Sequence, residues 1–186
     1  MPSIILGLSG QAGCGKGTIV DLLKAKFDVD YFVFSSILKD VLIRLHHELT
    51  RENFIKLSEA LRKSFGEDAL SYAIEHDALA SNKQIVIIDG IRRPEDIVAL
   101  EPLPQFKLLA IEVPAEIRFE RMKKRGEKAG ENDMTWERFL AEDQAPTEIT
   151  IPSVMKRAWK TISNAGTREE LETQLNNVLE ELNLMA

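Results

Sequence analysis

The sequence predicts an α/β protein, with a five-stranded parallel sheet between two layers of helices. Short apolar runs alternate with longer stretches of helical periodicity, which is the pattern of parallel strands joined by helical crossovers. The run 85–88 is apolar without alternation, as in a strand buried on both faces of a sheet. The five candidate strands are 4–8, 31–34, 84–88, 107–113 and 160–163.

Length and charge define the broad class of protein. A chain of 186 residues with 44% hydrophobic content suits one compact domain. Its net charge of −6 disfavours binding to nucleic acid or to an anionic membrane, because the summed field repels phosphate polyanions. Cys14 is the only cysteine, so no intrachain disulfide can form. We therefore expect a cytoplasmic monomer or homodimer whose partner is a small molecule.

Helical periodicity predicts helices at 18–26, 94–100 and 115–125, and a last helix from Thr167 to about residue 182. Thr167 and Glu170 form the capping-box pattern that opens this last helix. Three further helical patterns follow one another between the second and third strands, at 37–49, 53–65 and 69–79.

These patterns predict one domain with two additions to its core. We assign the core to 1–34, 83–125 and 144–186, a helical insertion to 35–82, and a short lid to the polar segment 126–143. The alternatives are an insertion that only covers a sheet edge and an ordinary loop in place of the lid.

Residues 10–18 read Gly-Gln-Ala-Gly-Cys-Gly-Lys-Gly-Thr, after the first strand and at the first turn of the first helix. This is where a phosphate-binding loop lies. We expect its glycines to adopt dihedrals closed to other residues and to bring amide groups against the ligand without a Cβ between them. The positive end of the helix and the ammonium of Lys16 would then meet a triphosphate. A glycine-rich hairpin turn is the alternative, but it does not call for Lys-Gly-Thr at a helix start.

The motif differs from the common form in the residue that follows the lysine. Gly17 stands where Ser or Thr usually ligates Mg²⁺, and Thr18 comes one residue later. Thr18 is therefore expected to bond a phosphate oxygen, with Mg²⁺ held largely through water. Asp89, at the end of the third strand, is the best carboxylate to orient the metal.

The Lys-Gly-Thr ending, with Gly10, Gly13 and Gly15 before it, resembles the phosphate loop of adenylate kinases and other nucleoside monophosphate kinases. The resemblance implies a three-layer P-loop kinase fold, ATP and Mg²⁺ as cofactors, and a nucleotide as phosphoryl acceptor. It assigns ATP contacts to Gly10, Ala12, Gly13, Cys14, Gly15, Lys16, Gly17 and Thr18.

The segment Asp-Gly-Ile-Arg-Arg at 89–93 extends the resemblance to the acceptor side. In nucleoside monophosphate kinases a strand ending in Asp-Gly is followed by an arginine that grips the acceptor phosphate, which implies Arg92 or Arg93. A solvated turn before a proline-started helix is the alternative. The pairing Asp-Gly-Ile-Arg and the segment 61–66 also resemble an uncharacterised archaeal family related to adenylate kinases and dephospho-CoA kinases.

The helical insertion is similar in its placement to the acceptor lobe of these kinases. The segment 34–39 resembles the part where they carry a serine or threonine and then an arginine, with Lys39 in the arginine's place. The resemblance implies acceptor contacts from Ser36, Lys39, Arg62, Asp89, Arg92 and Arg93, with Arg51 a weaker candidate.

Arg118, Arg121 and Arg125 recur at the spacing of one helical face. In the kinases resembled, arginines on this helix border the lid and stabilise the transferring phosphoryl group, and Arg121 and Arg125 match best. Together with Lys16 they are the predicted catalytic residues. A solvated basic face is the alternative. Gly166 is in the turn after the fifth strand. In related kinases this region lies by the adenine, so the resemblance implies that Gly166 contributes to ATP binding.

These observations indicate phosphoryl transfer from ATP to a nucleoside monophosphate. The acceptor phosphate is already an anionic nucleophile, so no general base is required. A dephospho-CoA kinase is one alternative, although its hydroxyl acceptor would call for a base. A regulatory module that binds and hydrolyses ATP without a small-molecule acceptor is another.

Overall fold

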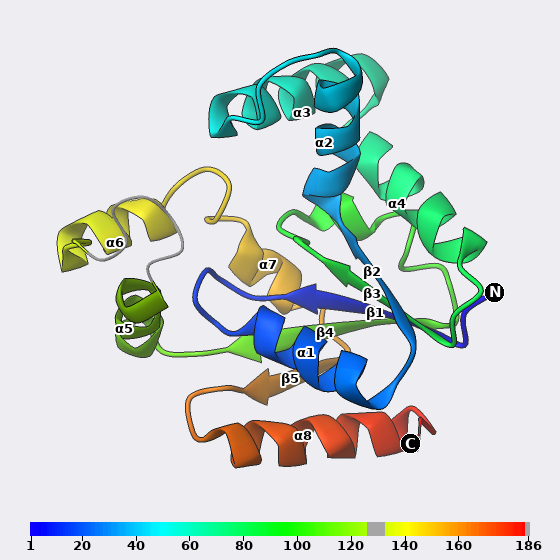
Figure 1. Ribbon diagram of the computed structural model, residues 1–186, viewed down its shortest axis with the longest axis vertical. Coiled ribbons are helices and arrows are strands. Elements are labelled where there is room, and N and C mark those ends of the chain that lie inside the picture. Colours follow the sequence, from blue (N-terminus) through cyan, green and yellow to red (C-terminus); the bar gives the residue numbers. More distant parts are fainter. Residues whose placement is uncertain (126–132, 185–186) are drawn as a thin grey trace. The chain divides into compact units, whose positions relative to one another are not determined.

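The computed structural model describes residues 1–125 and 133–184 (Figure 1). Its five strands form one sheet in the order β2-β3-β1-β4-β5, which confirms the predicted α/β class. The strands are β1 (Ile4–Ser9), β2 (Val29–Val33), β3 (Ile85–Asp89), β4 (Phe106–Glu112) and β5 (Lys160–Ser163).

The internal contacts divide the chain into two compact units. Unit 1 comprises residues 1–7 and 28–107, and unit 2 comprises residues 8–27 and 108–186.

Unit 1 is built around β3, the apolar strand that the sequence marks as buried. β3 pairs in parallel with β1, from Ile4↔Ile85 to Gly7↔Ile88, and with β2, from Val29↔Ile85 to Val33↔Asp89. Its first four residues are buried, as expected for a central strand. The helices of the unit are α2 (Phe34–Arg44), α3 (Arg51–Phe65) and α4 (Ala69–Ala80), followed by the short 3₁₀ helix η1 (Pro94–Ile97).

Several predicted bounds of unit 1 differ from the observed ones: the strand expected over 31–34 spans 29–33, and the next helix begins at Phe34 instead of residue 37. The helix expected to reach residue 49 ends at Arg44, because His46 takes a left-handed φ of 57° and the His47 amide donates to the Leu42 carbonyl. This is the geometry of a helix stop that satisfies the last carbonyls. The helix expected over 94–100 is only the 3₁₀ turn η1, which begins at a proline.

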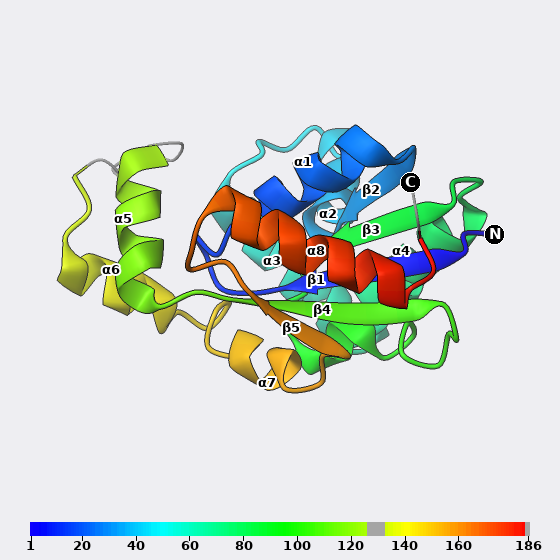
Figure 2. The same ribbon diagram turned by 90° about the horizontal axis from the view of Figure 1, so that it is seen from below.

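Unit 2 contains the phosphate-loop segment, β4, β5 and helices on both sides of them. β4 and β5 pair in parallel from Leu109↔Lys160 to Glu112↔Ser163. In Figure 2, α1 (Lys16–Lys26) and α8 (Arg168–Glu181) lie on one side of these strands and α7 (Ile151–Met155) on the other. An ion pair between Lys26 and Glu172, at 2.9 Å, joins α1 to α8. The capping box of Thr167 and Glu170 opens α8 as predicted.

Two helices of unit 2, α6 (Trp136–Asp143) and α7, are absent from the predicted elements. They have only eight and five residues, too short for a clear periodic signal. Before them, α5 (Ala115–Arg125) has the predicted bounds. Phe139 of α6 packs with Met122 of α5 in a buried cluster. Residues 126–132 of the predicted lid lie outside the described residues, so the lid stays a prediction.

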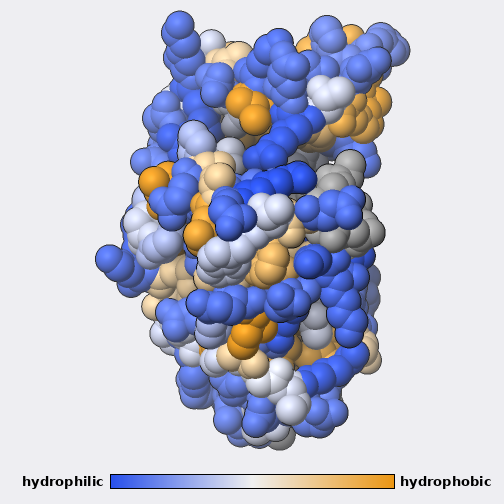
Figure 3. Space-filling view, turned by 90° about the vertical axis from the view of Figure 1, so that its left-hand side faces the viewer, coloured by the Kyte–Doolittle hydropathy of each residue, from blue (hydrophilic) through white to orange (hydrophobic). Residues whose placement is uncertain are grey.

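The surface carries no extended apolar face on the side drawn in Figure 3, where hydrophilic side chains predominate and hydrophobic ones form separate patches. Within the ranges 1–125 and 133–184, no helix is long and apolar enough to cross a membrane.

Candidate active site

The predicted phosphate loop joins β1 to α1 in unit 2. α1 begins at Lys16, two residues before the start predicted from periodicity, with Gly15 as its N-cap. Gly13 and Gly15 have φ values of 80° and 91°, a left-handed conformation that side chains rarely adopt. Gly10 is required for another reason, because a Cβ there would lie 2.6 Å from Cys14 Sγ and 2.7 Å from the Ile111 carbonyl oxygen. Three glycines therefore shape this loop.

Gly17 does not adopt a backbone conformation that is closed to other residues, so this part of the prediction is wrong for Gly17. It lies in the first turn of α1 without a left-handed φ, and a Cβ there would meet no protein atom within 4 Å. Neither backbone conformation nor packing within the described chain requires glycine at this position. The remaining part of the prediction is that a Cβ at Gly17 would interfere with a ligand.

The ammonium of Lys16 lies over the loop that it is predicted to serve. Its Nζ donates to the Gly10 carbonyl oxygen at 2.6 Å and lies 3.7 Å from Cys14 Sγ. These contacts hold a positive charge beside the loop, where a phosphate oxygen could replace the carbonyl as its acceptor. Cys14 itself is 1% exposed, which places its thiol inside the loop.

Asn164 supports the loop from the segment that follows β5. Its Nδ2 donates to the Cys14 carbonyl oxygen at 2.8 Å, and the side chain is buried. A Cβ on Gly15 would overlap this same Nδ2. The sequence interpretation placed the surrounding turn beside the base but missed this support. Its position directly after a strand was the available signal, because the carboxyl ends of parallel strands meet at one edge of the sheet.

Arg121 lines a cavity beside the phosphate loop, and one of its donor nitrogens has no hydrogen-bond partner among the described residues. A cavity of about 310 Å³ is lined by Gly15, Thr18, Arg121, Asn164, Gly166, Arg168 and Leu171. Within the described residues, the Nη1 atom of Arg121 is buried and has no hydrogen-bond partner. Buried polar groups are rarely left unpaired, so this nitrogen is available to an acceptor from outside the described residues. The structure thus places Gly15 and Thr18 of the loop, Arg121 and Gly166 around one cavity.

The three arginines predicted on one face of α5 have different surroundings. Arg118 is 2% exposed, Arg121 is half-buried and Arg125 is exposed. A solvated basic face is therefore wrong for Arg118. Its guanidinium forms two hydrogen bonds with Asp143 of α6, Nη1 to Oδ1 at 2.7 Å and Nη2 to Oδ2 at 2.8 Å.

Asp143 is a further residue that sequence analysis missed. Besides Arg118, its carboxylate accepts a hydrogen bond of 2.9 Å from Nε2 of Gln11, the second residue of the loop. Arg118 Nη1 also donates to the Ala12 carbonyl oxygen at 3.2 Å. No local pattern marks Asp143, because its partners lie 25 and 132 positions away along the chain.

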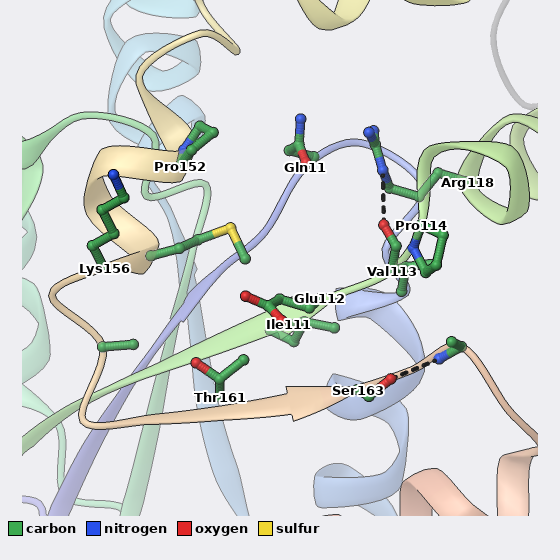
Figure 4. Close-up of a pocket in the computed structure, with 13 residues that line it drawn as sticks. Gln11, Ile111, Glu112, Val113, Pro114, Arg118, Pro152, Lys156, Thr161 and Ser163 are labelled. Atoms are coloured by element: carbon green, nitrogen blue, oxygen red, sulfur yellow. Dashed lines mark hydrogen bonds between the residues drawn. The ribbon is translucent and has the colours of Figure 1, made fainter.

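A second cavity, of about 720 Å³, lies between α7 and the carboxyl ends of β4 and β5. In Figure 4, Gln11 and Arg118 lie along one side of it, and Lys156, the residue after α7, lies across from Arg118. Thr161 and Ser163 of β5 contribute hydroxyl groups. The cavity is thus polar on several sides and shares Gln11 with the phosphate loop.

The residues predicted for the acceptor and for metal orientation lie in unit 1. Asp89 ends β3, and its Oδ1 accepts from the Gly90 amide at 2.6 Å while Oδ2 accepts from the Tyr31 hydroxyl at 3.0 Å. Gly90 has a left-handed φ of 82°. The carboxylate is therefore held in one orientation at the strand end, with one hydrogen bond on each oxygen.

Arg92 and Arg93 follow this strand end, and Asp96 holds their backbone in place. The backbone amides of both arginines donate to Asp96 Oδ2 at 3.0 Å. The Arg92 side chain is exposed, and Arg93 forms ion pairs with Glu67 at 2.9 Å and Glu95 at 3.6 Å.

Arg62 is held within the protein itself. It is 8% exposed, and its Nη2 donates to Asp96 Oδ1 at 2.7 Å. Nη1 donates to the Glu67 carbonyl and Nε to the Ser58 hydroxyl at 3.4 Å. Each guanidinium nitrogen thus has a protein acceptor, which gives Arg62 a structural role that the sequence did not predict.

Ser36 and Lys39 lie in the first turns of α2. The Ser36 hydroxyl donates to the Val33 carbonyl at 2.6 Å, and Lys39 is exposed. Arg51, the weaker candidate, is the exposed first residue of α3. Lys39 is therefore accessible to a ligand, whereas Arg62 is engaged.

The chain is similar to curated proteins over nearly its whole length. The UPF0200 protein TK1334 of Thermococcus kodakarensis is 30% identical over 184 residues, covering 96% of this chain and 98% of that protein. The UPF0200 protein MJ1399 of Methanocaldococcus jannaschii is 28% identical, with 96% and 90% covered.

Solved structures share the fold. Shikimate kinase from Bacteroides thetaiotaomicron has a TM-score of 0.61 at 14% identity, covering 97% of this chain and 99% of that one. TT1252 from Thermus thermophilus has a TM-score of 0.60 at 19% identity, with 98% and 99% covered. The fold is thus that of P-loop kinases.

Residues 9–139 match the AAA_17 family model, whose description is AAA domain. The chain therefore belongs to the AAA_17 family of AAA domains and, by its likeness to TK1334, to the UPF0200 family.

Proposed function

We propose that this protein is an ATP-dependent nucleotide kinase that transfers the γ-phosphoryl group of ATP to a nucleoside monophosphate. The observation that carries the proposal is the pairing of a phosphate loop with a cation that has a free donor among the described residues. Gly13 and Gly15 adopt left-handed conformations before a helix that starts at Lys16, and Arg121 lines the adjoining cavity with a buried nitrogen that has no partner within residues 1–125 and 133–184. A polyanion would satisfy these donors together.

The predicted site residues of unit 2 are assigned separate parts in ATP binding. The loop amides and the positive end of α1 bind the phosphates, and the Thr18 hydroxyl bonds a phosphate oxygen. Lys16 exchanges the Gly10 carbonyl for a terminal phosphate oxygen, so that its charge follows the transferring group. Arg121 and Arg125 neutralise charge that develops on that group. Gly166 lies beside the base.

Mg²⁺ is the metal that the donor chemistry fits. The Thr18 hydroxyl and the Asp89 carboxylate are hard oxygen donors, which Mg²⁺ prefers over nitrogen or sulfur. When bound, the metal neutralises charge on the β- and γ-phosphates. Asp89 is suited to orienting it because Gly90 and Tyr31 hold its carboxylate in place.

The acceptor phosphate is assigned to the cationic residues of unit 1. Arg92 is exposed and follows Asp89, and Lys39 is exposed on α2, so both are accessible to an anion. Arg93 and Ser36 complete the set. Arg62 also belongs to the predicted set, but its partners within the protein make it the weakest of these contacts. A nucleotide phosphate attacks without a general base, which suits a site made of cations and one carboxylate.

The test is an acceptor panel. The protein is incubated with ATP, Mg²⁺ and ribo- and deoxynucleoside monophosphates, with dephospho-CoA and buffer as separate arms, and the products are separated by chromatography. We expect a nucleoside diphosphate, and we expect Lys16→Ala to lower its rate by about 10² or more. Lys56→Ala, an exposed lysine of α3, is the matched control.

The other outcomes contradict the proposal in distinct ways. Formation of CoA alone would replace it with a dephospho-CoA kinase. ATP hydrolysis that no acceptor changes would replace it with a regulatory ATP-binding module.

A further inference from the structure

The contacts of Arg118 and Asp143 extend beyond an ordinary buried ion pair. The two side chains are 3% and 10% exposed and meet through two parallel hydrogen bonds. Arg118 Nε also donates to the Val113 carbonyl at 3.3 Å, and the guanidinium lies 5.1 Å from the centre of the Phe139 ring. Arg118 is thereby fixed from several directions at the junction of α5 and α6.

An ion pair in such a place is not required for packing. Taking two charges out of water costs about as much as their attraction returns, and well-packed apolar residues of similar volume are often neutral or stabilising replacements. Phe139, Met122 and their neighbours would accept such a replacement as part of an apolar cluster. The polar contacts therefore need an explanation other than stability.

The explanation lies in the phosphate loop. Arg118 Nη1 donates to the Ala12 carbonyl oxygen, and Asp143 Oδ2 accepts from the Gln11 side chain. A trans peptide is planar, so its C=O and N–H point in opposite directions. Drawing the Ala12 carbonyl toward Arg118 therefore directs the Gly13 N–H away from Arg118.

Gly13 is one of the two loop residues in a left-handed conformation, so the plane of its peptide is not set by ordinary backbone preference. Its own Cα is also close to α5, because a Cβ there would lie 2.9 Å from the Arg118 carbonyl oxygen. Side chain and backbone of Arg118 thus both determine how this peptide is placed.

We propose that Arg118 and Asp143 are a positioning pair that orients the Gly13 amide of the phosphate loop toward the phosphates of the nucleotide. Asp143 holds the guanidinium, the guanidinium holds the Ala12 carbonyl, and the carbonyl sets the direction of the next N–H. Neither side chain is assigned a contact with the nucleotide. The inference rests on the ATP-binding part of the proposed function and adds the residues that prepare the loop before ATP arrives.

The test separates loop geometry from stability by means of an apolar replacement. Arg118→Met combined with Asp143→Leu removes both charges and keeps the volume, so we expect a melting temperature at or above that of the wild type. ATP binding by calorimetry should nevertheless weaken by about tenfold or more, because an amide is no longer held in its binding direction. Glu142→Gln, the neighbouring acid that pairs with exposed Arg138, is the matched control and should leave both values unchanged.

A second variant keeps the proposal testable if the double variant does not fold. Arg118→Lys keeps the charge beside Asp143 but lacks the planar fork that also reaches the Ala12 carbonyl. We expect it to fold and to bind ATP several-fold more weakly. A folded double variant or a folded Arg118→Lys that binds ATP as tightly as the wild type would overturn the positioning role. Failure of the wild type itself to bind ATP would instead contradict the proposed function, and binding without transfer to any nucleotide would leave the positioning result intact.

Discussion

Asn164 holds the carbonyl of Cys14 from 150 positions along the chain, through a buried hydrogen bond of 2.8 Å. The same planarity that links Ala12 to Gly13 links the Cys14 carbonyl to the Gly15 amide. Two side chains outside the loop, Arg118 and Asn164, thus hold alternate carbonyls of the phosphate loop. The loop's shape is supported from outside as well as by its glycines.

Replacing Asn164 tests this support. Asn164→Ala leaves the Cys14 carbonyl without its buried donor, so we expect the free energy of unfolding to fall by about 1–3 kcal/mol. Denaturant unfolding measures the loss, and calorimetry should show weaker ATP binding. Asn53→Ala, which removes a hydrogen bond at an exposed position, is the control. An Asn164→Ala protein with wild-type stability and ATP affinity would show that the loop keeps its shape unaided.

Two glycines of the loop should respond to alanine in opposite ways. Gly15→Ala forces a side chain into a left-handed backbone and against Asn164, so we expect a loss of about 2 kcal/mol or more. Gly17→Ala meets no protein atom and improves helix propensity, so stability should be unchanged or rise by up to about 1 kcal/mol. Unfolding curves measure both changes.

ATP titration of Gly17→Ala then tests why glycine stands there. We expect weaker binding without loss of stability, because the added methyl group occupies space beside the phosphates. Unchanged affinity would show that the ligand does not approach this position.

Arg121 should be dispensable for folding and important for catalysis. Its buried Nη1 gains nothing from the described protein, so Arg121→Met should leave the melting temperature unchanged or slightly higher. The rate of phosphoryl transfer should fall by about 10² or more, because arginine contacts to a transferring phosphoryl group are worth that much or more. Lys124→Ala, an exposed residue of the same helix, is the comparison. A slow transfer rate in both variants would point to a general effect of charge on α5.

Arg62 and Lys39 should differ in kind. Arg62→Met leaves Asp96 buried without its ion-pair partner, so we expect a loss of about 3–5 kcal/mol in unfolding free energy. Lys39→Ala is exposed and should not change stability, but it should raise the KM for the acceptor by about tenfold. Steady-state kinetics with the acceptor varied at saturating ATP makes the distinction. A Lys39→Ala enzyme with unchanged KM would leave acceptor binding to Arg92 and Arg93.

The start of α8 should contribute a pH-dependent part of the stability. The pKa of Glu169 lies below its ordinary value because its own backbone N–H and the Thr167 hydroxyl donate to the carboxylate, with help from the charge of Arg168. A carboxyl group whose pKa is lower in the folded state than in the unfolded state stabilises the protein at pH values above the unfolded-state pKa. This stabilisation is lost as the pH falls through the folded-state pKa.

Glu169→Gln should therefore lower the melting temperature near neutral pH, and the difference from the wild type should shrink on acidification toward about pH 3. Thermal melts across this range measure the change. A difference that stays constant with pH would exclude ionisation of Glu169 as its cause.

The α/β class, the approximate positions of the strands and the position of the phosphate loop could be predicted from sequence alone. These depend on local patterns: apolar runs for buried strands, and glycines before a Lys-Gly-Thr helix start. The errors of the prediction have the same cause, because it used local patterns alone. The prediction extended α2 beyond Arg44, where His46 turns the chain, and it missed the short helices α6 and α7.

The partners of the buried polar groups became known only from the three-dimensional fold. Arg118 meets Asp143 across 25 positions, Arg62 meets Asp96 across 34, and Asn164 meets Cys14 across 150. A charged side chain is committed to the protein or available to a ligand according to what packs beside it, and elements distant in sequence supply those neighbours. Arg62 and Arg121 look alike in the sequence, yet folding gave a carboxylate to one and left a buried nitrogen of the other without a protein partner in the described chain.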